Sequence, residues 1–262
     1  MLSGGWVEVV ALAAAFVIAV LATPAGISGA VLLLPFQVSV LGTPSPAVTP
    51  TNLLYNVVAA PGAIYRYWRQ GQTGGRLTVV LIAGTLPGVI AGSFIRVELL
   101  PGARVFDLIV GLVLLPLGAW LAVSPSRPAG VIRRVRIPPP ALIVIAAAVG
   151  CIGGIYGIGG GSILAPILIG TGRPPSQVAP AALGSTFVTS VAGVVTFTIL
   201  SASHHGPVAP NWPTGIALGL GGLAGAYTGA RIQSRLPDAL IRRLVGLLVF
   251  AIGARYLWAG LS

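Results

Sequence analysis

The chain has 262 residues, of which 55% are hydrophobic and only 7% are charged, and its mean hydropathy is +0.96. This composition excludes a water-soluble globular protein and predicts an integral membrane protein that lies almost entirely in the bilayer. The net charge of +11 comes from arginines placed between apolar runs, without the interleaved aromatics of a nucleic-acid surface, so we interpret them as topology determinants.

The first half of the chain predicts a broken helix followed by three full membrane spans. Apolar helices are expected at residues 7–22, 30–41, 52–68, 77–95 and 105–123, with a break at Thr23-Pro24-Ala25-Gly26. The helix at 30–41 would extend only about 18 Å against a hydrocarbon core of about 30 Å, so it is a half-helix or a tilted, broken span. No Arg or Lys precedes the first apolar run, and we therefore expect it to stay in the membrane rather than to be cleaved as a signal peptide.

The second half repeats this order after a linker with four arginines and a triple proline. Its expected segments are a helix at 141–152, a glycine break at 153–162, a short helix at 162–169, and spans at 181–200, 212–230 and 240–257. The predicted fold is an all-α membrane protein with 8–10 membrane segments. Its units are a first repeat at 1–123, a cytoplasmic linker at 124–140 and a second repeat at 141–262.

The glycine break is the most informative stretch. Seven of the ten residues from Gly153 to Ser162 are Gly or Ser, and each glycine costs a helix about 1 kcal/mol relative to alanine. In lipid, such broken backbone persists only where protein covers it or where it lines a cavity. A related stretch, Gly26 to Pro35, aligns with Gly157 to Pro166. Two glycine-interrupted apolar segments at matching places indicate a transporter-type binding site.

Counting crossings orients the two halves. Each glycine-broken pair contributes an even number of crossings and three spans follow, so the second half is predicted to be inverted in the membrane. Placing segments 66–76, 124–140, 170–180 and 231–243 on one side gathers 12 of the 15 arginines there and leaves Arg96, Arg104 and Arg255 on the other. By the positive-inside bias, we expect that side to be the cytoplasm and both termini to be extracytoplasmic, in the inner cell membrane.

Together these motifs resemble the TauE/SafE family of sulfite and organosulfonate exporters, also called the 4-toluenesulfonate uptake permease family. The resemblance rests on Gly157–Gly161 ending at Pro166, its weaker copy ending at Pro35, and the polar starts Thr51-Asn52-Leu53 and Gly184-Ser185-Thr186 of the following spans. It covers nearly the whole chain. One departure is Ser28-Gly29-Ala30 where glycines are expected. The resemblance implies transport of small sulfur-containing anions such as sulfite, sulfonates or sulfoacetate, and leaves the direction open.

An oxyanion needs hydrogen-bond donors and positive potential, which two half-helix N-termini at 29–31 and 160–163 would supply without a buried charged side chain. Inverted repeats would bring these termini together near the midplane. Side chains of Asn52, Asn56 and Thr51 in one half and of Ser162, Ser185, Thr186 and Ser190 in the other would refine the site. The full candidate set is Ser28, Gly29, Ala30, Asn52, Asn56, Tyr156, Gly159, Gly160, Gly161, Ser162, Ser185, Thr186 and Ser190.

Alternative interpretations stay open for each of these residues. A small polar side chain in a membrane helix often only bonds a neighbouring carbonyl, and Tyr156 is equally suited to packing or to gating. The glycines could mark a close helix crossing. A phosphate loop would need a Gly-Lys-Ser/Thr ending, which the chain lacks. His204 and His205 are expected to be solvated in an outside loop, so we predict no metal, cofactor or catalytic group.

No Asp, Glu or His falls in the middle of a predicted span, so the sequence indicates no proton relay and favours export driven by membrane potential alone.

The leading interpretation is a carrier with alternating access. An anion channel with the same site, a membrane enzyme acting on lipid-linked phosphate and a purely structural protein are the alternatives, although an enzyme would need clustered acids or histidines at membrane depth. The oligomeric state and the substrate are not determined by the sequence.

Overall fold

The computed structural model describes residues 5–72, 74–100, 103–123, 137–171, 173, 175–204, 206–233 and 237–261. Within these ranges the chain forms ten α-helices, one 3-10 turn and no strand, which confirms the all-α prediction. In chain order the elements are α1 (Gly5–Ala22), the 3-10 turn η1 (Thr23–Ala25), α2 (Ala30–Ser39), α3 (Val48–Arg69), α4 (Gly75–Glu98), α5 (Ala103–Val123), α6 (Pro139–Tyr156), α7 (Gly161–Gly170), α8 (Pro175–Ser201), α9 (Trp212–Ile232) and α10 (Asp238–Leu261). Apart from residues 137–140, the predicted linker lies outside the described residues.

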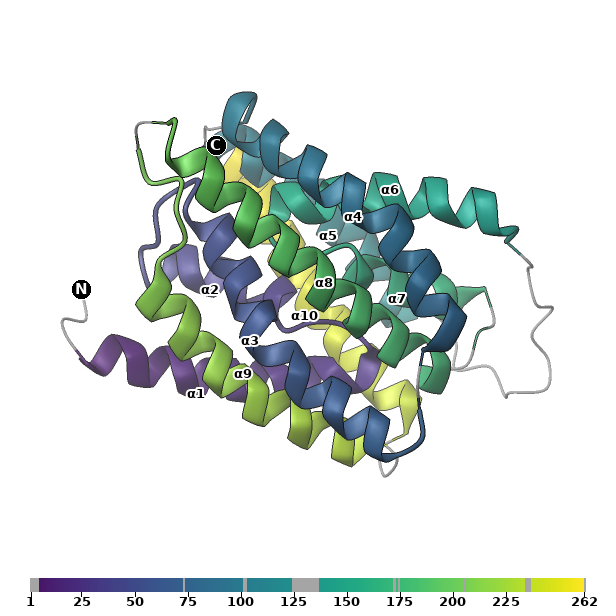
Figure 1. Ribbon diagram of the computed structural model, residues 1–262. Helices are drawn as coiled ribbons and strands as arrows, with labels where there is room; N and C mark the ends of the chain where they lie inside the picture. The colour runs from purple at the N-terminus through teal and green to yellow at the C-terminus, as the bar shows by residue number, and fades with distance from the viewer. Residues whose placement is uncertain are drawn as a thin grey trace.

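Helix length and composition fit a membrane protein. Among the described residues, α4, α6 and residues 176–201 of α8 are long and apolar enough to cross a bilayer, and α1 and α2 are shorter apolar helices. The helices α2 and α7 have ten residues each, about 15 Å, and lie inside the bundle behind α3 and α8 in the view of Figure 1. Most of their apolar side chains are buried, as Leu33 and Leu164 illustrate with no exposed surface. Two short helices therefore form the interior that the long helices enclose.

The boundaries around the glycine break differ from the prediction. We expected the helix to end at Ile152, but α6 continues through Gly153 and Gly154 to Tyr156. These two glycines serve close packing: a Cβ on Gly154 would lie 2.4 Å from the Val89 carbonyl oxygen. The helix ends at Gly157, whose φ of 78° is the left-handed conformation that suits glycine.

The glycine ladders bring helices from opposite halves into backbone contact. Gly88 of α4 faces α6, where an added Cβ would lie 2.2 Å from the Ala147 carbonyl oxygen. Gly221 of α9 faces α1, where it would lie 2.0 Å from the Leu12 carbonyl oxygen. A side chain at either position would displace backbone, so the small-residue spacing is required by the close approach of these helices.

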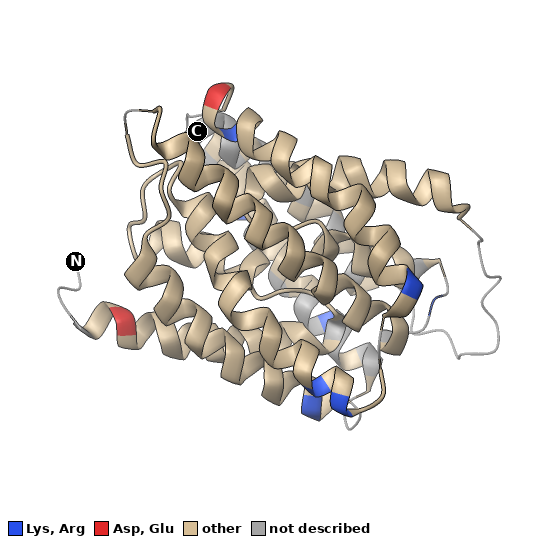
Figure 2. Ribbon diagram, viewed as in Figure 1, with Lys and Arg blue, Asp and Glu red and all other residues tan. Residues whose placement is uncertain are grey.

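Charged residues separate toward the two ends of the bundle. In Figure 1, α3 and α9 finish at the end where α4 and α10 begin, while α1 begins and α4, α8 and α10 finish at the opposite end. In Figure 2, most of the blue segments gather at the first of these ends, which we call the arginine end. The red segments mark the other, which we call the carboxylate end, where Glu8 opens α1 and Glu98 closes α4.

Candidate functional site

The two glycine breaks, residues 26–29 between η1 and α2 and residues 157–160 between α6 and α7, lie side by side in the interior. The backbone amide of Ser28, in the first break, donates to Oγ of Ser162 at the start of α7, at 3.2 Å. Gly26 also fits closely against the second half, because an added Cβ would lie 3.1 Å from Cα of Ala179 on α8. The beginnings of α2 and α7, predicted from sequence to form one site, are thus directly hydrogen-bonded to each other.

The second break is the more glycine-dependent of the two. Gly157 and Gly159 have φ angles of 78° and 68°, and α7 then begins at Gly161. A Cβ on Gly161 would lie 2.0 Å from the Ala182 carbonyl oxygen and 2.6 Å from Oγ1 of Thr186, so the first turn of α7 presses on α8. A Cβ on Gly159 would meet Oγ of Ser190 at 3.2 Å. The hydroxyls of Thr186 and Ser190 therefore border the start of α7.

Three polar atoms of the candidate residues have no hydrogen-bond partner among the described residues. They are Nδ2 of Asn56, Oγ1 of Thr186 and Oγ of Ser190, on side chains at most 1% exposed. The opposite atom of the Asn56 amide, Oδ1, accepts a bond from Oγ of Ser28 in the first break. Each unpaired buried donor costs about 1–3 kcal/mol, so three around the two breaks are unfavourable unless something binds there.

Both polar atoms of the Asn52 side-chain amide are hydrogen-bonded. Its Nδ2 donates to the Ala30 carbonyl at 2.9 Å, which leaves Oδ1 to accept from Nε2 of Gln37 at 2.9 Å. Because a carbonyl only accepts, Nδ2 of Asn52 must face Ala30, and Oδ1 of Asn52 must then face Nε2 of Gln37. The orientations of both side-chain amides are fixed in this way. Asn52 thus fixes the first turn of α2 to α3 and supports the site instead of presenting a free donor.

The remaining candidates have mixed surroundings. Ser185 faces α4, with its Oγ 2.9 Å from Oγ1 of Thr85. Thr51 donates to the Ala47 carbonyl at 2.7 Å and accepts from the Asn211 amide at 2.8 Å, so it ties α3 to the loop before α9. Tyr156 is 2% exposed in the last turn of α6. The structure therefore brings the candidates into one buried region, with Asn56, Thr186 and Ser190 holding the unpaired donors.

With this geometry in view, comparison with known proteins decides the family. Residues 11–256 match the family described as sulfite exporter TauE/SafE. The chain belongs to this family. The family match confirms the resemblance deduced from the glycine motifs and the polar helix segments.

Relatives of this TauE/SafE protein carry transporter names. A probable membrane transporter protein of Xylella fastidiosa (strain Temecula1) is 28% identical over 89% of this chain and 88% of its own length. The probable membrane transporter protein y4hK of Sinorhizobium fredii is 26% identical over 81% and 83%. The probable membrane transporter protein YunE of Bacillus subtilis is 32% identical over 45% and 41%. No solved structure matches the chain. Family and relatives together indicate a membrane transporter rather than an enzyme.

Some buried polar residues of this TauE/SafE protein were missed by the sequence analysis. Gln37 has no exposed surface, and its Oε1 lacks a partner among the described residues. Thr85 contacts both Ser185 and Gly160, where an added Cβ would lie 2.5 Å from Cγ2 of Thr85. A signal existed for each: Gln37 is a polar residue in an otherwise apolar short helix, and Thr85 follows a glycine of the α4 ladder.

Arg96 was predicted to flank the membrane on the extracytoplasmic side, but its side chain is buried in the last turn of α4. Its Nε donates to Oγ1 of Thr49 at 3.3 Å, and it also donates to Oγ of Ser45 and the Leu100 carbonyl. Thr49 in turn donates to the Ile155 carbonyl, just before the second break, at 3.2 Å. The guanidinium is thus held by the hydroxyls of Ser45 and Thr49, around the start of α3, and by the Leu100 carbonyl.

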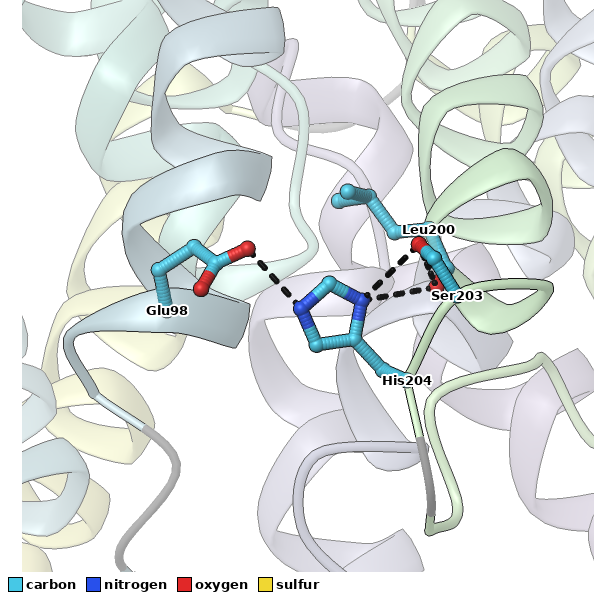
Figure 3. Close-up of polar contacts among 4 residues, drawn as sticks. All are labelled: Glu98, Leu200, Ser203 and His204. Carbon is cyan, nitrogen blue, oxygen red and sulfur yellow. Dashed lines mark hydrogen bonds and ion pairs between the residues drawn. The ribbon is translucent and has the colours of Figure 1, made fainter.

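His204 was predicted to be a solvated loop residue. It lies in the loop after α8 as expected, but it pairs with Glu98, the last residue of α4, with Nε2 2.8 Å from Oε1 (Figure 3). Its Nδ1 lies 2.9 Å from the Leu200 carbonyl oxygen and 3.2 Å from Oγ of Ser203. A carbonyl and a carboxylate both accept, so the doubly protonated ring satisfies both contacts. His205 lies outside the described residues.

The hydrogen bond to Leu200 is the main reason that the pKa of His204 is raised above its ordinary value of 6.5; partial burial opposes this shift, and the Glu98 carboxylate reinforces it. Among the described residues, no three His, Cys, Asp or Glu side chains gather closely enough to hold a metal ion.

Proposed function

We propose that this protein is a secondary transporter that exports small sulfur-containing oxyanions, such as sulfite, sulfonates or sulfoacetate, across the inner cell membrane. The anion binds between the two glycine breaks, at the beginnings of α2 and α7. Helix N-termini carry partial positive charge and free N–H groups, so an anion can be held there without an ionised side chain in lipid.

The observation that carries this proposal is the group of three unpaired buried donors on Asn56, Thr186 and Ser190. All three atoms are donors or hydroxyls, which suits an oxyanion with several acceptor oxygens. Two come from α8 and one from α3, so a bound anion would join the two halves of the chain. The neighbouring Ser28 to Ser162 hydrogen bond supports the same place, because it ties the two breaks together there.

Two inverted repeats account for the packing. Helix α1 packs on α9 through the glycines of α9, and α4 packs on α6 through the glycines of α4, so the same contact occurs twice with the halves exchanged. In such a fold the anion site lies between the repeats, and rocking of one against the other would open it to each side in turn. With the arginine end in the cytoplasm, both termini are extracytoplasmic.

The membrane potential supplies a sufficient driving force for export. An anion that leaves a negative-inside cell gains about 2.3 kcal/mol per charge per 100 mV. Transport of a charged sulfur anion in liposomes should therefore follow an imposed potential. Proton-coupled transport that persists with the potential clamped at zero would contradict this mode of coupling.

The binding site is tested by the thermal stability of the purified protein with sulfite, thiosulfate, sulfoacetate, taurine, sulfate, phosphate and chloride, because stabilisation follows ligand occupancy. The variant is Thr186→Val, which removes an unpaired hydroxyl. The matched control is Thr189→Val, equally buried on the same helix, whose hydroxyl bonds the carbonyls of Ser185 and Thr186 at 2.8 and 3.2 Å.

We expect a sulfur anion to stabilise the wild type and Thr189→Val, and Thr186→Val to need about tenfold more anion because one hydrogen bond to a charged group is lost. An equal anion response in all three proteins would remove Thr186 from the site. Stabilisation by phosphate alone would contradict the sulfur substrate. The alternative, an anion channel with the same site, would show single-channel conductance instead of saturable exchange.

A further inference from the structure

A group of arginines lies at the arginine end, where α3 and α9 finish. Helices α3 and α9 pack in parallel register: an added Cβ on Gly215 would lie 2.6 Å from Leu54, and one on Gly219 would lie 2.4 Å from Val58. One turn further, Gly62 faces the Leu223 carbonyl oxygen in the same way. Each step advances four residues on both helices, so the last turns of α3 and α9 end side by side.

Those last turns carry three arginines. Arg66 and Arg69 are in the last turn of α3, and Arg231 is in the last turn of α9. The guanidinium of Arg66 lies over the ring of Tyr227, 5.9 Å from its centroid, which continues the same register and joins the two helices. Among the described residues, Nε of Arg66 has no hydrogen-bond partner and is buried, whereas the side chains of Arg69 and Arg231 are exposed. The surface thus combines one partly buried arginine with two exposed ones.

This cluster lies far from the carboxylates whose side chains the structure describes, Glu8 and Glu98, because both are at the carboxylate end (Figure 2). Like charges at the ends of two helices in register repel one another. An anion placed between them reduces that repulsion, and a phosphate matches the planar guanidinium geometry.

The depth of the cluster in the membrane indicates where such a phosphate comes from. Tyr65 and Trp68, on the same last turns of α3, are 50% and 65% exposed, with ring centroids 6.2 Å apart. Exposed Tyr and Trp at the end of a membrane helix lie at the level of the lipid headgroups. We propose that Arg66, Arg69 and Arg231 bind the phosphate of an anionic phospholipid between the ends of α3 and α9.

The bound lipid acts on the protein through the first glycine break. Nε2 of Gln233, just after α9, donates to the Pro24 carbonyl at 2.9 Å, and the Tyr67 hydroxyl of α3 donates to the Thr23 carbonyl at 3.4 Å. Both helix ends therefore hold η1, the turn before Ser28. A phosphate that clamps α3 to α9 fixes the position of this turn.

The test titrates phosphatidylglycerol into protein in neutral detergent and follows the unfolding temperature, with phosphatidylcholine and inorganic phosphate as comparison ligands. The variants are Arg66→Gln and Arg231→Gln. The matched controls are Arg76→Gln, an exposed arginine of α4 at the arginine end, and Arg255→Gln, an exposed arginine of α10. Native mass spectrometry of each protein counts retained phosphatidylglycerol without relying on unfolding.

We expect phosphatidylglycerol, and not phosphatidylcholine, to stabilise the wild type and both controls. The half-saturating concentration should rise about fivefold in each of Arg66→Gln and Arg231→Gln, since one arginine near a membrane surface contributes about that factor. The proposal is overturned if the controls lose as much affinity as the variants, if phosphatidylcholine acts equally, or if inorganic phosphate alone gives the full effect. Because no sulfur anion is used, this result is independent of the proposed transport function.

Discussion

The first and second glycine breaks meet in the interior but are built differently. At the first, the amide of Ala30 donates to Oγ of Ser28, and Asn52 is committed to the Ala30 carbonyl and to Gln37. At the second, Gly159 and Gly161 stand where the first has Ser28 and Ala30, and the hydroxyls of Thr186 and Ser190 have no partner among the described residues. Side-chain hydrogen bonds thus hold the start of α2 more fully than the start of α7. The hydroxyls left unfilled beside the second break suit a site for a changing occupant.

Replacing a glycine in each break gives the largest expected difference. Gly157→Ala combines a left-handed φ with a Cβ that would lie 2.4 Å from the Thr49 carbonyl oxygen. Conformational strain and displaced backbone together should cost about 4 kcal/mol. Gly26→Ala has a similar φ but a nearest contact of 3.1 Å, so it should cost about half as much. Thermal unfolding in detergent measures both, and equal losses would mean that the second break is no more constrained than the first.

Replacing a hydrogen-bonded side chain at the first break should have the second-largest effect on the free energy of unfolding. Asn52→Leu leaves Nε2 of Gln37 buried without its partner and removes a bond to the Ala30 carbonyl, which should cost about 3 kcal/mol. Ser190→Ala removes a hydroxyl that has no partner, so the apo protein should keep or gain stability. Chemical unfolding of the two variants without ligand tests the contrast. A similar loss in both would show that the second break is also closed by protein hydrogen bonds.

A charge substitution separates binding from stability. Asn56→Asp keeps an acceptor for Oγ of Ser28 but replaces the unpaired Nδ2 donor with negative charge. We expect anion affinity to fall at least tenfold, because an anion would be repelled at short range. Asn56→Gln, which retains the amide, is the control for size. Anion-dependent thermal shifts measure both, and an unchanged affinity in Asn56→Asp would place the anion elsewhere.

The smallest effect is expected at the carboxylate end, where α4 and the α8 loop are joined by Glu98 and His204. The same two helices are joined near the second break by Thr85 and Ser185, a contact without a titrating group. The pKa of His204 is raised in the folded protein. The protonated ring therefore stabilises the folded state fully below the ordinary pKa of 6.5, and this stabilisation is lost as the pH rises through the raised pKa. The unfolding temperature should decline slightly between about pH 6 and about pH 8. His204→Gln should abolish this slope, and a slope unchanged in that variant would assign it to another group.

The helix order could be predicted because the apolar runs and the two glycine breaks are long patterns of the chain. The first residues of the helices were harder to predict. Helix α3 begins at Val48 and α8 at Pro175, earlier than predicted, because prolines fit the early turns of a helix and do not exclude it. The sequence grouped Asn52, Asn56, Thr186 and Ser190 as small polar candidates, but it did not show which of them are hydrogen-bonded. Whether a side-chain amide is hydrogen-bonded depends on partners such as Gln37, and the spacing of residues in the sequence does not identify those partners.

The cross-half packing of the glycine ladders has a consequence for biosynthesis. Helix α1 makes close backbone contacts with Gly221, Gly225 and Gly229, which follow it by about 200 residues. Until α9 is inserted, that face of α1 is covered by lipid. Helix α1 is therefore synthesised well before the helix that encloses it, and this part of the packing forms only when α9 joins it in the bilayer.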